Sequence, residues 1–403
     1  MKILHITPTY FPSWSFGGIT RVSYEVTKEL SKRGHYVEVW TSDAFDRYSR
    51  VSNNYNNVEI NGIKVKYFKN LSFTLTRKFY DLLFTPSLIK FAYREVNRFD
   101  IIHLHGVRTF QSLATYPFLK RNRVSYIVQA HGLLWKVSIK EIMHYTLYHF
   151  YNKTFAKKLL EDASRAIALS RVEFNQYRSM GIPKEKIAII PNGINLSKYA
   201  ELPPKDSFRK KFNIPEDKKI ILYLGRIHKT KGIDFLVRAY AYLKNEINFR
   251  NAILVIAGPN DGYLSEIKSL VQYLDISNSV LFMGLLSEKD KMGAYVDSDV
   301  VVNVEPSNVY GLVPLEAAAC STPVIVSKTN AISEVIIDGK FGFSVRYGDV
   351  ISLAFMLQRI LNDEKLAKKL GENGRKHIFD HLGWSRIIER YEQVYDEVLT
   401  TKL

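Results

Sequence analysis

Short apolar runs with the spacing of strands alternate with helical runs along nearly all of the 403 residues. The first unit starts with the run KILHI, continues through a loop rich in Pro and Gly and a helical pattern that ends at Gly34, and closes with the run YVEVWT. Strands that alternate with helices in this way form parallel sheets with helices on both faces. The sequence therefore predicts an α/β protein with doubly wound sheets.

One polar stretch, residues 196–218, interrupts this alternation with three prolines and predicts a linker. A second series of strand-like runs follows it: IILYLG, AILVIAG, SVLFMG, DVVVNV and TPVIV. A chain of this length is too long for one typical core, so two domains are expected. We predict a first domain over residues 1–195 and a second over residues 196–383, with the amphipathic segment 384–403 packed on a domain surface.

Targeting and redox signals are few. Cys320 is the only cysteine, which excludes an intramolecular disulfide framework, and no Cys/His zinc spacing is present. The apolar run before Pro8 is too short for a signal peptide, and no stretch approaches 18 apolar residues. We expect a cytoplasmic protein for which only peripheral contact with a membrane is open.

The net charge of +17 is concentrated in the first half of the chain. Residues 1–200 carry 30 Lys and Arg against 14 Asp and Glu, whereas residues 201–403 carry 27 against 26. A basic surface of this kind favours an anionic partner. Nucleic acid, an anionic membrane face and a phosphorylated substrate all fit the charge, and so does a basic surface that is merely solvated.

Two loops that contain glycine lie where a phosphate can bind. Gly17 and Gly18 end the first loop directly before a helical run, so their N–H groups can hold a phosphate or form an ordinary turn. In the second half, the loop LGRIHKTKGID places Gly225, Arg226 and Lys231 between a strand and a helix. A guanidinium fork and a point cation at one strand end suit a diphosphate, although a solvated basic loop has the same composition.

Glu316 lies in the run NVYGLVPLEAAAC, near the start of a helical pattern of small apolar residues. A carboxylate among such neighbours loses hydration unless it lies at an exposed helix end or meets hydrogen-bond donors. It is therefore either a first-turn residue favoured by the helix dipole or a group that binds a ligand.

Two further patterns raise the question of a metal. The run DSD at 297–299 matches a metal-binding DxD pattern, but Asp299 directly precedes an apolar strand and can simply begin it. His103 and His105 share one face of a strand, and His131 follows another strand. Three histidines can bind zinc or serve as hydrogen-bonding groups. Because no thiolate or carboxylate pair lies nearby in the sequence, we predict no metal.

In their order and spacing these motifs resemble the retaining glycosyltransferases of family 4, which have the GT-B fold. The resemblance covers nearly the whole chain through these runs: TPTYFPSWSFGGI, AHG, EKIAIIPNGINLSKY, LGRIHKTKGID, IAGPNDGY, LFMG and PSNVYGLVPLEAAACSTPVI. It implies two Rossmann-like domains that face a cleft, the first binding the acceptor and the second the donor. It also implies that the helix at 384–403 crosses back onto the first domain.

The resemblance implies roles for single residues as well. Glu316 is expected to accept hydrogen bonds from the ribose of a sugar nucleotide, and Arg226 and Lys231 to neutralise the departing diphosphate with help from Gly18. His131 is expected beside the sugar that is transferred. Further donor contacts are expected along the base and from backbone groups at these residues: Gly17, Gly225, Gly284, Leu285, Tyr310, Gly311, Leu312 and Val313.

One position departs from the family pattern. The family usually carries two Glu separated by seven residues, and counting back from Glu316 places Asn308 where the first is expected. The two residues that usually lie between PS and that position are missing. Asn308 either recognises a different sugar through its amide or marks a weakened enzyme, and Glu305 can reach in from a reshaped loop.

The implied enzyme is a metal-independent hexosyltransferase without a cofactor. It would move a sugar from a UDP-, GDP- or ADP-sugar to a glycan or to a polyprenyl-phosphate-linked or glycolipid acceptor. The basic, aromatic-rich segments 76–99 and 136–160 are expected to hold the first domain against anionic lipid. The alternatives are a non-catalytic sugar-nucleotide-binding homologue and a sugar-nucleotide epimerase. A nucleic-acid binder also fits the charge, but no such module is recognised, so no nucleic acid is expected.

Overall fold

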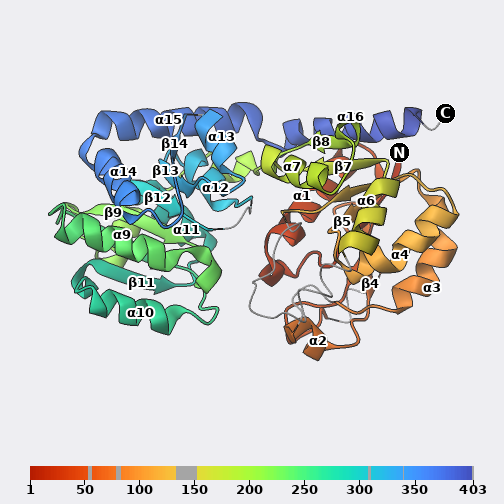
Figure 1. Ribbon diagram of the computed structural model, residues 1–403, viewed down its shortest axis with the longest axis horizontal. Coiled ribbons are helices and arrows are strands. Elements are labelled where there is room, and N and C mark those ends of the chain that lie inside the picture. Colours follow the sequence, from red (N-terminus) through yellow and green to blue (C-terminus); the bar gives the residue numbers. More distant parts are fainter. Residues whose placement is uncertain (53–56, 79–82, 133–151, 307–309, 339, 402–403) are drawn as a thin grey trace. The chain divides into compact units, whose positions relative to one another are not determined.

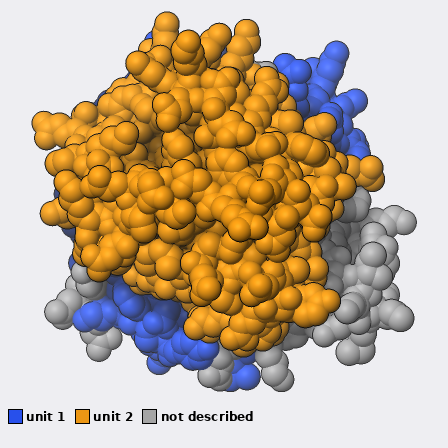
Figure 2. Space-filling view, turned by 90° about the vertical axis from the view of Figure 1, so that its left-hand side faces the viewer, with its two compact units in different colours: residues 1–193, 384–403 blue, residues 194–383 orange. Residues whose placement is uncertain are grey.

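The computed structural model describes residues 1–52, 57–78, 83–132, 152–306, 310–338 and 340–401 (Figure 1). The chain divides into two compact units, which Figure 2 draws in different colours. Unit 1 consists of Met1–Gly193 and Trp384–Leu403, and unit 2 of Ile194–Gly383. Asn308 lies outside the described residues, and so does most of the segment 136–160.

Unit 1 is built on an eight-stranded sheet in the order β3-β4-β2-β1-β5-β6-β7-β8. Neighbouring strands are parallel, except that β3 and β4 are antiparallel. The strands are β1 (Lys2–Ile6), β2 (Tyr36–Ser42), β3 (Val58–Ile60), β4 (Ile63–Phe68), β5 (Ile101–His105), β6 (Tyr126–Gln129), β7 (Arg165–Ala168) and β8 (Ile187–Ile189). The strand order reverses between β1 and β5, and sheets of this kind bind ligands beyond the carboxyl ends at such a point.

Helices pack against this sheet and bury an apolar core. They are α1 (Gly18–Lys32), α2 (Phe73–Lys78), α3 (Ser87–Glu95), α4 (Phe110–Arg121), α6 (Lys157–Asp162), α7 (Arg171–Ser179) and α16 (Trp384–Thr400), with the short turns η1 (Trp14–Phe16), η3 (Val96–Arg98), η4 (Asn152–Ala156) and η5 (Lys184–Lys186). In α1 the side chains of Val22, Val26 and Leu30 recur at helical spacing and are buried. This apolar stripe is what makes the run a helix that packs on one face.

The last helix, α16, belongs to unit 1 although the chain reaches it through unit 2. The hydroxyl group of Tyr395 lies 2.7 Å from Nδ1 of His103, and that of Tyr391 donates to Oε1 of Gln129 at 3.1 Å. Arg33, at the end of α1, donates to the carboxylate of Glu392 at 2.9 Å. The expectation that the final helix crosses back onto the first domain is confirmed.

Unit 2 holds a six-stranded, fully parallel sheet in the order β11-β10-β9-β12-β13-β14. Its strands are β9 (Lys219–Leu224), β10 (Ala252–Ala257), β11 (Val280–Gly284), β12 (Val300–Asn303), β13 (Val324–Ser327) and β14 (Gly342–Val345). Its helices are α8 (Ser207–Phe212), α9 (Ile233–Asn245), α10 (Leu264–Tyr273), α11 (Glu288–Asp297), α12 (Val313–Ala319), α13 (Ser333–Asp338), α14 (Val350–Asn362) and α15 (Glu364–His381), with turns η6 (Leu196–Tyr199), η7 (Lys229–Lys231) and η8 (Ser277–Ser279). The strand order reverses between β9 and β12, as in a dinucleotide-binding fold.

The predicted α/β architecture of doubly wound sheets is confirmed, but the predicted linker is wrong. Residues 196–218 fold into unit 2 and include η6 and α8. The carboxylate of Asp297 accepts the backbone N–H groups of Phe208 at 2.8 Å and Arg209 at 3.1 Å. The buried guanidinium of Arg209 donates to the carbonyl of Lys218 at 2.7 Å. The polar residues of this stretch make specific hydrogen bonds within unit 2. Composition alone cannot distinguish polar residues with such partners from polar residues that are solvated in a linker.

Among the described helices, none combines the length and the apolar character that crossing a bilayer requires.

Candidate functional site

The carboxyl ends of β9 and β12 lie where the strand order of unit 2 reverses. Gly225 follows β9, and a side chain added at Gly258, after β10, would lie 1.8 Å from the Gly225 carbonyl oxygen. Beyond this tight contact, the carbonyl of Arg226 accepts a hydrogen bond from the Tyr223 hydroxyl at 2.9 Å. The guanidinium of Arg226 pairs with Oδ2 of Asp261 at 2.5 Å. Arg226 is thus held at the sheet edge where folds of this class bind their ligands.

Lys231 lies in the turn η7, which follows Arg226. Its Nζ contacts both carboxylate oxygens of Glu305 at 2.8 Å, and Glu305 follows β12. Gly232 permits this approach, since a side chain there would lie 2.3 Å from the carbonyl oxygen of Val304. An ion pair that is largely shielded from water therefore joins the two strand ends that flank the reversal, and it fixes the ammonium group in place.

Glu316 lies in the first turn of α12 and is 7% exposed. Its Oε2 accepts a hydrogen bond from the Tyr295 hydroxyl at 2.7 Å and lies 3.4 Å from Nζ of Lys291. Burial and the neighbouring Glu316 carboxylate raise the pKa of Tyr295, so this hydroxyl stays protonated and donates. The carboxylate is desolvated and specifically supported, which a helix-dipole preference alone does not require.

The other predicted residues of unit 2 lie at the same edge of the sheet. Gly284 ends β11, and its carbonyl accepts the N–H of Gly258 at 2.7 Å. Leu285 follows and is 78% exposed. Four residues lead from β12 into α12, the first of them buried: Tyr310, Gly311, Leu312 and Val313. The topology therefore brings together the unit 2 residues that the sequence singled out, apart from Asn308, which is outside the described residues.

In unit 1, Gly17 and Gly18 form the start of α1. Gly17 is the N-cap residue with φ of +84°, a conformation that favours glycine. Added Cβ atoms at Gly17 or Gly18 would meet no described atom within 4 Å. Packing against the described residues therefore does not require glycine at position 18. The amino-terminal end of this 15-residue helix is open to an anion.

His131 follows β6 and has a left-handed φ of +57°. Its Nε2 lies 2.9 Å from Nδ1 of His105. The N–H of Gly132 donates to Oε1 of Glu173 at 2.7 Å, and the other carboxylate oxygen accepts the N–H of Leu169 at 2.6 Å. Burial lowers the pKa of His131 to about 3, so the ring is neutral at ordinary pH. These contacts hold the ring through His105 and the backbone through Glu173.

Two family models match the chain. The model described as Glycosyltransferase Family 4 matches residues 16–198, and the model described as Glycosyl transferases group 1 matches residues 204–377. Together they span most of both units. The chain belongs to the family 4 glycosyltransferases.

Similar proteins extend over the full length of this glycosyltransferase. It is 27% identical over 400 residues to N-acetyl-alpha-D-glucosaminyl L-malate synthase of Bacillus anthracis, which covers 98% of this chain and 97% of that protein. It is 23% identical over 428 residues to D-inositol 3-phosphate glycosyltransferase of Kineococcus radiotolerans, with 97% and 93% covered. Sucrose-phosphate synthase from Thermosynechococcus elongatus superposes with a TM-score of 0.77 at 22% identity, with both chains covered completely. The HepE protein of Anabaena, solved with UDP-glucose, gives 0.75 at 19%, again with complete coverage. These likenesses confirm the GT-B fold.

Sequence reasoning missed the acidic residue that holds the His131 loop of this glycosyltransferase. Ser170 and Glu173 have the spacing of a capping box, and the Ser170 side chain does cap α7 by accepting the N–H of Glu173. The Glu173 carboxylate, however, binds the N–H groups of Leu169 and Gly132. Burial raises its pKa to about 7 in spite of these two hydrogen bonds. The S-x-x-E pattern was the available signal, but it points to a helix cap alone.

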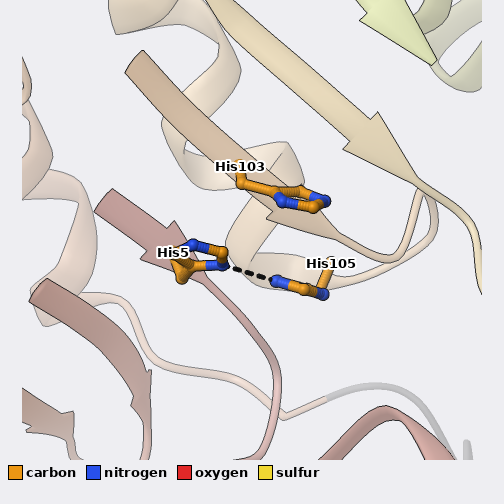
Figure 3. Close-up of side chains that lie close together, drawn as sticks. All are labelled: His5, His103 and His105. Atoms are coloured by element: carbon orange, nitrogen blue, oxygen red, sulfur yellow. Dashed lines mark hydrogen bonds between the residues drawn. The ribbon is translucent and has the colours of Figure 1, made fainter. Parts of the chain in front are cut away.

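Figure 3 shows a buried cluster that includes His5 of β1, which sequence reasoning also missed, with His103 and His105 of β5. One nitrogen of each ring lies within 4.8 Å of the others. The rings of His103 and His105 are stacked, with centroids 4.3 Å apart and planes 16° apart. A metal lies in the plane of each imidazole that binds it, so two rings stacked face to face cannot both direct a lone pair at one ion.

The second metal-like pattern, the DSD run, has structural partners instead: Asp297 and Asp299 accept backbone N–H groups. That the enzyme uses no metal stays a prediction.

Acid should destabilise unit 1 through these histidines. Burial, followed by the neighbouring imidazoles, holds the pKa of His5, His103 and His105 well below the ordinary 6.5. The folded protein therefore binds fewer protons than the unfolded chain below that pH. Each histidine contributes stability that is complete above about pH 6.5 and is lost at about 1.4 kcal/mol per pH unit below it. We expect scanning calorimetry to show that the Tm falls as the pH is lowered from about 7.5 to about 5.5.

Two variants test the assignment of this slope. His103→Gln removes one of the buried imidazoles and should make the Tm less dependent on pH. Glu173 acts in the opposite direction, because its raised pKa of about 7 favours the folded state where the carboxyl group is protonated. Glu173→Gln should therefore make the acid slope steeper. A wild-type Tm that does not change over this range would contradict the neutral, buried histidines.

Proposed function

We propose that this glycosyltransferase moves a hexose from a nucleoside diphosphate sugar to a glycan or lipid-linked glycan, with retention at the anomeric carbon. The observation that carries the donor class is the pair of cations, Arg226 and Lys231, that follows β9 at the reversal of unit 2. Each is oriented by a carboxylate, Asp261 or Glu305. Two fixed cations at one strand end suit a diphosphate. The structurally similar HepE protein was solved with UDP and with UDP-glucose, which supports testing uridine nucleotides first.

The chemistry needs positive charge at the leaving group. Breaking the anomeric C–O bond builds negative charge on the departing diphosphate and oxocarbenium character on the sugar. Fixed cations stabilise that charge in the transition state without reorganising. Among the described residues, Glu305 takes two of the three N–H donors of the Lys231 ammonium, which leaves one donor for a phosphate oxygen. In this proposal the leaving phosphate oxygen takes the acceptor's proton, so neither a separate base nor a metal is assigned.

The remaining residues bind the parts of the donor that do not react. Glu316 would accept hydrogen bonds from the ribose hydroxyls, and its support by Tyr295 and Lys291 keeps the carboxylate in place. Backbone groups at Gly311 and Gly18 would contact the sugar and the diphosphate. His131 is assigned to the sugar that is transferred.

A ligand screen followed by product analysis tests the proposal. We would measure the Tm of the purified protein with UDP-, GDP- and ADP-sugars and with the free nucleotides. A ligand at a hundred times its Kd should stabilise the protein by about 2.7 kcal/mol. The donor that binds is then incubated with glycan and lipid-linked acceptors, and NMR of the product gives the anomeric configuration. An inverted product would contradict retention.

Binding of a nucleotide sugar without transfer to any acceptor would favour the second candidate function. This candidate is a non-catalytic sugar-nucleotide-binding homologue, which keeps the fold of the family without turnover. The observation in its favour is Asn308, which stands where the family usually has the first of its two glutamates. Absence of binding across the whole panel, in protein shown to be folded, would indicate that the donor site is lost and would contradict the proposed transfer.

Replacing Gly18 by alanine separates folding from phosphate binding. Because residue 18 begins α1 and a methyl group there has space, the variant should keep its Tm or gain up to about 1 kcal/mol of stability. The same methyl group would block a phosphate that approaches the backbone, so KM for the donor should rise about tenfold, which is about 1.4 kcal/mol. Steady-state kinetics measure this. Gly17→Ala provides the contrast, since its left-handed φ becomes strained and the Tm should fall. An unchanged KM in Gly18→Ala would contradict the phosphate contact.

We also propose that unit 1 binds an anionic membrane surface. On α3, Leu88 is buried, whereas Ile89 and Tyr93 are exposed beside the exposed basic residues Lys90 and Arg94. Exposed apolar and aromatic side chains beside cations are typical of an interfacial helix. Sedimentation with anionic vesicles should show binding that weakens as salt rises and that is lost in the double variant Lys90→Glu, Arg94→Glu. If the wild-type protein does not sediment with anionic vesicles even at low salt, this proposal fails.

A further inference from the structure

Helix α7 presents two hydrogen-bond acceptors to the backbone around His131. Oε1 of Glu173 accepts the N–H of Gly132 at 2.7 Å, and the hydroxyl oxygen of Tyr177 accepts the N–H of Ala130 at 3.0 Å. Glu173 and Tyr177 are four residues apart, so they lie on the same face of the helix. The two residues that flank His131 in the chain are therefore both bonded to one face of α7. We call Glu173 and Tyr177 the α7 clamp.

Each side chain of the α7 clamp makes a second hydrogen bond, to backbone in or just after β7. The hydroxyl group of Tyr177 donates to the carbonyl of Ile167 at 3.2 Å, and Oε2 of Glu173 accepts the N–H of Leu169 at 2.6 Å. Burial and the neighbouring Glu173 carboxylate raise the pKa of Tyr177, which keeps its hydroxyl group protonated. Both side chains are buried, so they join the backbone after β6 to that of β7 away from water.

The backbone of His131 needs this support because its conformation is uncommon. Its φ of +57° lies in the left-handed region, which few residues other than glycine adopt. Residues in such conformations persist where their surroundings over-determine them, and they cluster at functional sites. The ring has one contact of its own, between Nε2 and Nδ1 of His105 at 2.9 Å. That contact fixes the end of the side chain, whereas the α7 clamp fixes the backbone from which it extends.

We propose that Glu173 and Tyr177 are positioning residues for sugar transfer, which act through the backbone on either side of His131. Groups that act on a reacting centre have to be held within about 0.5 Å of the productive geometry. A displacement of about 1 Å can lower a rate about a hundredfold. The place of His131 beside the transferred sugar rests on the proposed function, whereas the α7 clamp does not. Spectra without substrate therefore test the clamp, and kinetics test what it positions.

The sequence allows the N–H of Gly132 to be observed almost alone. It contains only two His-Gly pairs, His105-Gly106 and His131-Gly132. Protein labelled with ¹³C in the histidine carbonyl and ¹⁵N in glycine therefore gives two amide signals in a carbonyl-filtered NMR spectrum. The signal of Gly132 is the one that is lost in His131→Asn. The N–H of Gly106 donates to the carbonyl of Gln129 at 2.8 Å, so its signal is an internal reference.

Glu173→Gln should move the amide proton signal of Gly132 to higher field. Burial raises the pKa of Glu173 to about 7, so spectra at pH 8.5 report the ionised carboxylate. Glutamine carries no charge, and only one of its two terminal atoms accepts a hydrogen bond. The N–H groups of Gly132 and Leu169 therefore cannot both keep their acceptors, while the signal of Gly106 should stay in place. A Gly132 signal at its wild-type position in Glu173→Gln would overturn the proposal.

Kinetics measure the effect of the α7 clamp on transfer. In Glu173→Gln and in Tyr177→Phe, kcat should fall about tenfold to a hundredfold, with KM for the donor within about threefold of the wild type. Tyr126→Phe is the matched control, because Tyr126 is also a buried tyrosine and begins β6, the strand that leads to His131. Its hydroxyl group donates to the carbonyl of Leu159 at 2.7 Å. This variant should keep kcat within about threefold.

A double variant distinguishes positioning from a general loss of structure. Asparagine tolerates the left-handed conformation, so His131→Asn removes the ring and keeps the backbone. In this background Glu173→Gln should lower kcat by no more than about twofold, because the group that it positions is already absent. A further loss of about tenfold would mean a structural role only and would overturn the proposal. If the wild type transfers no sugar, or if His131→Asn transfers it as fast as the wild type, the proposed function of His131 fails, and the spectra alone decide whether the α7 clamp exists.

Discussion

Replacing Lys231 by alanine is expected to lower kcat for sugar transfer by about 10²- to 10³-fold, the usual loss for a fixed group that stabilises transition-state charge. The ammonium is held against both oxygens of Glu305 at 2.8 Å, at the end of the strand that adjoins β9. Its charge therefore needs no reorganisation when the diphosphate departs. Because the charge on the leaving group grows only as the bond breaks, kcat should fall more than donor affinity does. Steady-state kinetics with the donor found by the screen measure both.

Stability has to be separated from catalysis in this variant. Without Lys231 the buried carboxylate of Glu305 loses its partner, which costs about 3–5 kcal/mol when a buried pair is broken. The double variant Lys231→Ala, Glu305→Gln removes that charge and should regain stability without regaining kcat. Lys229→Ala is the matched control, because this exposed lysine lies in the same turn. A double variant with wild-type kcat would exclude Lys231 from the chemistry.

Replacing Glu316 by glutamine is expected to weaken nucleotide binding about tenfold to a hundredfold. Hydrogen bonds to a charged group contribute about 1.5–3 kcal/mol, and the amide keeps the shape of the side chain but not its charge. The Tyr295 hydroxyl can still donate to the amide oxygen, so the fold should persist. Since the ribose is remote from the bond that breaks, KM should rise while kcat changes little. Calorimetric titration of the free nucleotide gives the affinity.

The control for this second variant is Glu288→Gln. Glu288 is the other carboxylate beside Lys291, at 3.3 Å, but it is largely exposed. The substitution removes an ion-pair partner of the same lysine, Lys291, but leaves the proposed ribose contact of Glu316 intact, so nucleotide affinity should be kept. If Glu316→Gln binds the nucleotide as tightly as the wild type, Glu316 would return to the simpler role of a residue favoured by the helix dipole.

The sequence was sufficient for the fold because each local signal agreed with the architecture. Alternating apolar runs, the glycine that ends the first helix and the cations after one strand are all local features of the chain. The loop that carries Arg226 and Lys231 could be placed because a parallel sheet brings the carboxyl ends of its strands to one edge. Glu316 was singled out for the same kind of reason, as a charge among small apolar residues.

The parts that sequence reasoning missed are pairings between distant segments. Asp261 lies 35 residues from Arg226, and Tyr295 lies 21 residues from Glu316. His5 is 100 residues from its partner His105. The local sequence of an apolar strand does not indicate that one of its residues, here His5, will contact an imidazole on the neighbouring strand. The false linker has the same origin, since the partner of its backbone N–H groups is Asp297, about 90 residues further along the chain.

The place of α16 in unit 1 imposes an order on biosynthesis. Residues 1–193 leave the ribosome without the helix that later contacts His103 and Gln129. The whole of residues 194–383 must be made before Tyr391 and Tyr395 exist, which at 5–20 residues per second takes about 10–40 s. During that interval the nascent first unit lacks two of its buried tyrosines and their hydrogen bonds. In this period the surface of unit 1 that α16 later covers is accessible to chaperones and proteases, even though residues 1–193 are made first.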